Sequence, residues 1–142
     1  MKSINPYLLF NGNASEAFDF YKSVFGGEFS FLQHFRDMPD ADKVPENEKD
    51  KILHVALPIG NGIIIMGSDT SLSMGRKVET GNNIAISVNT DNDDETGKIY
   101  NALSAGGKIL IPLGKTFWNA YYGMFIDKFG IPWMVSNVYN EH

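Results

Sequence analysis

The chain has 142 residues, a formal net charge of −5 and no cysteine. This length fits one domain of the commonest size, ~100–150 residues, with a single core. The absence of cysteine excludes disulfides, thiolate zinc sites and a cysteine nucleophile. The 12 basic residues are scattered, whereas nucleic-acid binders concentrate Lys and Arg, so we expect no nucleic-acid partner.

Hydrophobic residues make up 43% of the chain and aromatic residues 13%, which is enough to build a core and argues against disorder. Residues 1–6 contain no apolar run of signal-peptide length. No span reaches the ~20 apolar residues that a membrane helix needs. The sequence therefore predicts a cytoplasmic protein that has no membrane partner.

The first half of the chain predicts a strand, a helix and three more strands. Residues 4–10 are typical of a strand, and residues 13–16 have the spacing of a helix N-cap followed by Glu at the third helical position. Apolar residues then recur at three- and four-residue spacings up to a glycine pair at 26–27, which predicts a helix over 14–25. Strand-like runs follow at 28–35, 52–58 and 63–66.

The same order of elements is predicted again roughly 80 residues later. Residues 83–89 are typical of a strand, and a second helix is expected between a cap at 92–95 and a glycine pair at 106–107. Three further strands are predicted at 108–113, 121–127 and 133–138. A β-α-β-β-β order that occurs twice is stronger evidence than any one strand.

Two segments fall outside this pattern. Residues 37–50 form a polar stretch with two prolines and no apolar period, which predicts a mobile loop or lid. Residues 70–81 are rich in Ser, Thr and Gly, which predicts a linker between the two halves.

Four short stretches carry a family resemblance that extends over nearly the whole chain. They are PYLLFNGNA at 6–14, ILHVAL at 52–57, TFW at 116–118 and DKFGIPW at 127–133. Through them the chain resembles the vicinal oxygen chelate superfamily, which includes glyoxalase I, bleomycin-resistance proteins and extradiol dioxygenases. Within that superfamily it is most similar to the PhnB-like branch.

The resemblance implies a single glyoxalase-like α+β domain over residues 1–142, in which two βαβββ modules, 1–69 and 82–142, form an incomplete barrel around a central cavity. It also implies a homodimer. It does not imply one reaction, because one fold hosts many functions. The branch often carries the label of a ubiquinone-biosynthesis methyltransferase, but the sequence shows no glycine-rich strand-to-helix turn for S-adenosylmethionine.

Metal-using members of the superfamily place His, Glu or Gln on the first and fourth strands of each module, and those strands carry no His or carboxylate here. A divalent ion needs about three such ligands. His34 and His54 lie on different predicted strands without a neighbouring carboxylate, and His142 is terminal. We interpret Asp69 as a strand-end residue and Asp127 as the start of a turn. We therefore expect no metal and no cofactor.

Six residues are candidates for binding a small molecule. His54 lies between apolar neighbours and could act as an acid or base near neutral pH, although we interpret it chiefly as a hydrogen-bonded structural histidine. The aromatic candidates could line an apolar pocket or pack in a core or dimer interface. The candidate ligand-binding residues are Tyr7, His54, Phe117, Trp118, Tyr122 and Trp133. The sequence assigns no catalytic residue.

The leading hypothesis is a PhnB-like protein that binds a small aromatic or amphipathic molecule in a cavity without metal. Two alternatives stay open. One is a metal-dependent lyase or dioxygenase that uses His54 with further ligands. The other is a resistance protein that sequesters a drug without turnover. The sequence does not decide whether the protein is an enzyme.

Overall fold

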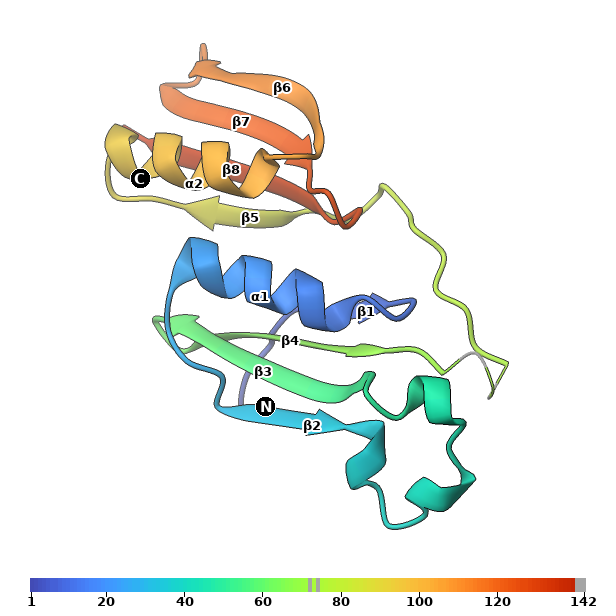
Figure 1. The fold of residues 1–142 in the computed structure, drawn as a ribbon. Coiled ribbons are helices and arrows are strands. Elements are labelled where there is room, and N and C mark those ends of the chain that lie inside the picture. The colour runs from blue at the N-terminus through green and yellow to red at the C-terminus, as the bar shows by residue number, and fades with distance from the viewer. Residues whose placement is uncertain (72, 74, 140–142) are drawn as a thin grey trace. The chain divides into compact units, whose positions relative to one another are not determined.

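The structure is a computed structural model that describes residues 1–71, 73 and 75–139 (Figure 1). The chain divides into two compact units, Met1–Glu79 and Thr80–His142. Among the described residues, each unit holds one four-stranded sheet and one α-helix. The predicted α+β class with two βαβββ halves is confirmed, and the strands form two separate sheets rather than one closed barrel. The expected central cavity stays a prediction.

The first unit is built on a sheet of strand order β1-β4-β3-β2. Its elements in chain order are β1 (Tyr7–Phe10), α1 (Ala14–Phe25), β2 (Phe31–His34), β3 (Ile52–Gly60) and β4 (Ile63–Asp69). β1 pairs with β4 in parallel, and the other pairs are antiparallel. The helix predicted over 14–25 is confirmed at both ends. β1 is shorter than predicted because Asn5 accepts from the Ile64 N–H through its side chain, at 3.0 Å, rather than through its backbone.

The polar stretch between β2 and β3 contains local structure that its sequence did not predict. It forms three short 3₁₀ helices, η1 (Phe35–Asp37), η2 (Ala41–Lys43) and η3 (Glu46–Glu48). The Arg36 side chain forms an ion pair with Asp50 at the end of the segment. The predicted interruption between two strands is thus a loop with local 3₁₀ turns, and its role as a mobile loop or lid stays a prediction.

The second unit repeats the arrangement in a sheet of order β5-β8-β7-β6. Its elements are β5 (Ile86–Asn89), α2 (Asp93–Ser104), β6 (Lys108–Lys115), β7 (Ala120–Ile126) and β8 (Pro132–Val138). β5 pairs with β8 in parallel, as β1 does with β4. None of the described helices is long and apolar enough to cross a membrane.

In each unit the helix lies against one face of the sheet, and an aromatic ring of the helix rests on a glycine (Figure 1). Phe18 of α1 lies over Gly67 of β4, and Tyr100 of α2 lies over Gly123 of β7. A Cβ atom at either glycine would overlap the ring. The two glycines therefore let the helices approach their sheets closely, and both rings are buried.

The two helices begin differently. Asn92 caps α2 as predicted, because its side chain accepts the Glu95 N–H at 2.8 Å. Asn13 occupies the predicted N-cap position of α1, but its side chain makes no cap hydrogen bond. A carboxylate from the end of β4 takes that place, since Asp69 Oδ1 accepts the Ala14 N–H at 2.9 Å.

Candidate functional site

One face of the first sheet is turned away from α1. Along β1, Leu8 and Phe10 are buried on the side of the helix, whereas Tyr7 and Leu9 point to the other side and are exposed. The strand pairing continues this face across the sheet, with Met66 beside Tyr7 and Ser68 beside Leu9 on the neighbouring strand β4. We call this surface the open face of the first unit.

Three flat side chains gather on the open face. The Tyr7 hydroxyl lies 3.0 Å from His54 Nδ1, and the two rings are stacked with centroids 5.5 Å apart and planes 22° apart. Phe31 lies on β2, the other strand that pairs with β3, and its ring centroid is 5.2 Å from that of the His54 imidazole. We call Tyr7, Phe31 and His54 the imidazole cluster. The interpretation of His54 as a hydrogen-bonded histidine is confirmed.

The imidazole cluster was only partly predictable. Tyr7 and His54 were candidates, but Phe31 was not, although 46% of it is exposed. The signal that could have found it is the pairing of β2 with β3, in which Gln33 lies opposite His54 and Phe31 opposite Ala56. This pairing joins residues that are far apart in the chain, so local periodicity does not show it.

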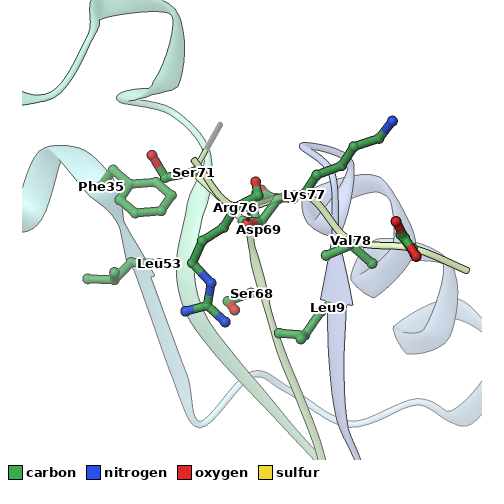
Figure 2. Close-up of a pocket in the computed structure, with 11 residues that line it drawn as sticks. Leu9, Phe35, Leu53, Ser68, Asp69, Ser71, Arg76, Lys77 and Val78 are labelled. Atoms are coloured by element: carbon green, nitrogen blue, oxygen red, sulfur yellow. Dashed lines mark hydrogen bonds between the residues drawn. The ribbon is translucent and has the colours of Figure 1, made fainter. Parts of the chain in front are cut away.

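The first unit contains a pocket of about 420 Å³ (Figure 2). Its lining residues are Leu9, Phe35, Leu53, Ser68, Asp69, Thr70, Ser71, Arg76, Lys77, Val78 and Glu79. Leu9 is two residues beyond Tyr7 on the same face of β1, and Leu53 directly precedes His54. Because Tyr7 and Leu9 lie on the same face of β1, the pocket lies next to the imidazole cluster along this strand.

Asp69 lines the pocket, but its carboxylate oxygens accept hydrogen bonds from backbone N–H groups. Its Oδ1 accepts the N–H groups of Gly12 and Ala14, both at 2.9 Å, and its Oδ2 accepts the Ile52 N–H at 2.9 Å. Only 4% of the residue is exposed. The interpretation of Asp69 as a strand-end residue is confirmed, and its oxygens are occupied by three donors.

Residues 70, 71 and 76–79, part of the linker expected over 70–81, belong to the first unit and line the pocket. The Asn11 side chain holds them to β1, since its Oδ1 accepts the Val78 N–H and its Nδ2 donates to the Val78 carbonyl, both at 2.8 Å. Glu48 of η3 accepts from Ser71 Oγ at 3.2 Å and from Ser73 Oγ at 2.8 Å. This side of the pocket therefore depends on hydrogen bonds between residues that are far apart in the sequence, which no local pattern predicts.

Three of the predicted aromatic residues meet in the second unit. Phe117 is 97% exposed and its ring makes an edge contact with Trp118 at a centroid distance of 5.0 Å. Trp118 in turn contacts Tyr122 at 5.6 Å. The Tyr122 hydroxyl donates to Met134 Sδ at 3.4 Å. We call Phe117, Trp118 and Tyr122 the aromatic row.

Trp133 is placed differently from the other five candidates. Its side chain is buried, with 0% exposed, and its Nε1–H donates to Asp127 Oδ2 at 2.9 Å. On β8 it packs on the side of α2 with Phe125, its partner on β7. The sequence left open whether Trp133 lines a ligand pocket or packs in a core or interface, and the structure places it in the core of the second unit.

Asp127 also supports the backbone. Its Oδ1 accepts the N–H groups of Phe129 at 2.8 Å and Ile131 at 3.0 Å, and the chain turns through Gly130 with a φ of +91°. The predicted turn that begins at Asp127 is confirmed.

The donor set on the open faces does not fit a divalent ion. Among residues 1–71, 73 and 75–139, no group of three His, Asp or Glu side chains is close enough to hold one. The residues that face away from the helices on β1, β4, β5 and β8 are Tyr7, Leu9, Ile64, Met66, Ser68, Ser87, Asn89, Pro132, Met134, Ser136 and Val138. None of these supplies an imidazole or a carboxylate.

Comparison with known proteins gives matches along almost the whole chain. A family model described as 3-demethylubiquinone-9 3-methyltransferase matches residues 2–136. Protein YjdN from Escherichia coli (strain K12) is 29% identical over 143 residues, which cover 95% of each chain. The crystal structure of protein PA1353 from Pseudomonas aeruginosa is 40% identical, with a TM-score of 0.84 and coverage of 96% of this chain and 97% of that one.

More distant solved structures share the fold. A PhnB protein from Bacillus cereus is 23% identical with a TM-score of 0.78, over 96% of this chain and 99% of that one. A glyoxalase/bleomycin resistance protein/dioxygenase family enzyme from Burkholderia phytofirmans is 16% identical with a TM-score of 0.59, over 93% and 96%. The arrangement of two βαβββ halves is therefore that of the glyoxalase-like fold.

Proposed function

Because the chain belongs to the PhnB-like family of 3-demethylubiquinone-9 3-methyltransferase proteins, we propose a binding function in which its first unit holds a small aromatic or amphipathic molecule on the open face. The observation that carries this proposal is the imidazole cluster of Tyr7, Phe31 and His54 beside a pocket of about 420 Å³. That volume falls within the ~300–1,000 Å³ of small-molecule sites.

The side chains of the imidazole cluster suit a flat ligand. Aromatic pairs contribute about 0.5–1.5 kcal/mol beyond the apolar area that they bury. The exposed Phe31 offers such a ring on β2, and the Tyr7 hydroxyl with the His54 imidazole offers a polar edge. A ligand that combines an aromatic ring with a polar group would satisfy both parts of the surface.

Methyl transfer, which the family description implies, needs a place for a methyl donor. Proteins commonly hold nucleotide-like groups at a glycine-rich turn that leads from a strand into a helix. In the turn between β1 and α1, the N–H groups of Gly12 and Ala14 already donate to Asp69. The turn between β5 and α2, residues 90–92, contains no glycine. The residues present do not fit such a donor, so we propose binding rather than methyl transfer.

The metal-dependent lyase or dioxygenase reading requires ligands that the open faces do not carry among the described residues. Drug sequestration is the same binding without a reaction, and recovery of the bound molecule unchanged would support it. The homodimer and the cytoplasmic location expected from the sequence stay proposals of the same kind.

Binding can be tested with 2-naphthalenemethanol, a neutral fluorescent amphiphile, titrated with the full chain. We expect saturable binding that weakens about tenfold in Phe31→Ala, since the ring contact contributes ~1.4 kcal/mol. Phe29→Ala is the matched control, because Phe29 lies near Phe18 and Val55 on the side of α1. Absence of saturable binding, or an equal loss in both variants, would contradict the proposal.

A further inference from the structure

The pocket beside the imidazole cluster contains one inward-pointing cation. Figure 2 shows the Arg76 guanidinium directed toward Leu53, Ser68 and Leu9, whereas the Lys77 side chain extends away from them. The pocket wall also contains the apolar side chains of Leu9, Leu53 and Val78. A positive charge beside apolar side chains is suited to an amphipathic ligand with an anionic end.

Arg76 has no acidic partner in the part of the chain that the structure describes, since the ion pairs found there involve other cations. Two carboxylates also line the pocket, those of Asp69 and Glu79. Asp69 is buried and accepts three backbone N–H bonds. Glu79 forms no ion pair with Arg76 within 4.0 Å. The guanidinium is therefore free to bind an anion.

The backbone on both sides of Arg76 is fixed by hydrogen bonds. Thr70 Oγ1 donates to the Arg76 carbonyl at 3.0 Å, and the Arg76 N–H donates to the Ser71 carbonyl at 3.4 Å. Two residues further on, the Asn11 side chain makes its pair of 2.8 Å bonds with Val78. A cation on a fixed backbone loses less freedom on binding, which favours affinity.

We propose that Arg76 makes this pocket selective for an aromatic carboxylate, whose carboxyl group binds the guanidinium while its ring lies on the imidazole cluster. The proposal rests on the binding function proposed above. The planar guanidinium matches a carboxylate with two parallel N–H···O bonds. The Ser68 hydroxyl, on the open face beside Leu9, provides a further donor at the pocket wall.

Three naphthalene probes separate charge from ring binding in the full chain: 2-naphthoate, 2-naphthamide and 2-naphthalenemethanol. We expect 2-naphthoate to bind about tenfold more tightly than 2-naphthamide at low salt, as one charge-assisted contact allows. Arg76→Gln should abolish this preference and leave 2-naphthamide binding unchanged. Lys98→Gln is the charge-matched control and should keep the preference, since Lys98 is exposed on α2 in the second unit and does not line the pocket.

Asn11→Ala tests whether the fixed backbone matters. It leaves Arg76 in the chain but removes both bonds to Val78, so we expect the preference for 2-naphthoate to fall several-fold while circular dichroism stays unchanged. The proposal is overturned if 2-naphthoate and 2-naphthamide bind equally, or if the preference survives Arg76→Gln. If 2-naphthalenemethanol still binds in a Phe31-dependent way, only the role of Arg76 fails, whereas absence of binding by all three probes defeats the proposed function as well.

Discussion

The two units repeat one order of elements, yet their sheets turn different side chains away from the helix. In the first unit Tyr7 and His54 stack on the open face. At the corresponding place in the second unit, Tyr122 contacts Met134, and Ser136 Oγ lies 3.4 Å from an Asn89 side-chain oxygen. The repeat thus preserves the packing of helix on sheet, while the chemistry of the open face differs.

The carboxylate near the helix start comes from a different element in each unit. In the first unit the carboxylate stands on the strand, where Asp69 accepts the Ala14 N–H of the helix. In the second unit it stands on the helix, where Asp93 accepts from Asn137 Nδ2 at 3.0 Å and from the Tyr139 hydroxyl at 2.9 Å. Each carboxylate thus joins a helix start to the last strand of its module, Asp69 through a backbone N–H of α1 and Asp93 through the Asn137 side chain of β8.

The largest expected effect concerns Asp69. Asp69→Asn should lower the free energy of unfolding by about 3 kcal/mol, because one amide oxygen replaces two carboxylate oxygens and leaves buried N–H groups without an acceptor. Urea unfolding followed by circular dichroism measures this. Asp93→Asn is the second-unit control and should cost less than about 1 kcal/mol, since its partner Tyr139 is exposed. Similar losses in both variants would contradict the difference drawn here.

The glycines under the helix rings test the part that the units share. Gly67→Ala and Gly123→Ala should each lower the free energy of unfolding by about 2 kcal/mol, because the new Cβ overlaps Phe18 or Tyr100. Gly97→Ala within α2 is the control. It meets no neighbour within 4 Å and should stabilise the chain by about 1 kcal/mol. A neutral result at either sheet glycine would mean that its helix can shift away.

The helix caps give a smaller difference between the units. Asn92→Ala should lower the free energy of unfolding by about 1 kcal/mol, because it removes the acceptor of the Glu95 N–H. Asn13→Ala should change it by less than about 0.5 kcal/mol, since Asp69 caps that helix start instead. Thermal or urea unfolding of the two variants distinguishes them. Equal losses would show that Asn13 also supports its helix.

The smallest expected effect on stability comes from Tyr7. Tyr7→Phe keeps the ring that stacks on His54 but removes the hydroxyl 3.0 Å from Nδ1. We expect the free energy of unfolding to change by less than about 0.5 kcal/mol at this exposed site. The imidazole ¹⁵N chemical shifts of His54 should nevertheless move, because the hydrogen bond selects the tautomer. Unchanged shifts would mean that this bond does not form in solution.

Much of the fold could be predicted because its signals are local. The apolar period of α1 and the glycine pair after it placed the helix at 14–25, and the repeat of that pattern indicated two halves. The resemblance to the vicinal oxygen chelate superfamily and its PhnB-like branch is confirmed by the matching family and fold. These inferences depend on residues that are close in the chain or on whole motifs.

The features that the sequence did not reveal depend on contacts between distant residues. Asp69 rather than the Asn13 side chain accepts an N–H at the start of α1, because β4 ends beside that helix start. Phe31 joins the imidazole cluster only through the pairing of β2 with β3. Arg76 lies at the pocket in a segment that is hydrogen-bonded to β1, since Asn11 binds Val78, which is 67 positions further along the chain. Strand periodicity gives no information about any of these three contacts.

The most direct test of the binding function is a map of amide chemical shifts in the full, ¹⁵N-labelled chain titrated with 2-naphthalenemethanol. We predict that the largest shifts occur at Tyr7, Phe31, His54 and their neighbours on β1, β2 and β3, with small shifts in the second unit. Shifts concentrated on the aromatic row around Trp118 and Tyr122, or the absence of saturable shifts anywhere, would contradict a binding site on the open face of the first unit.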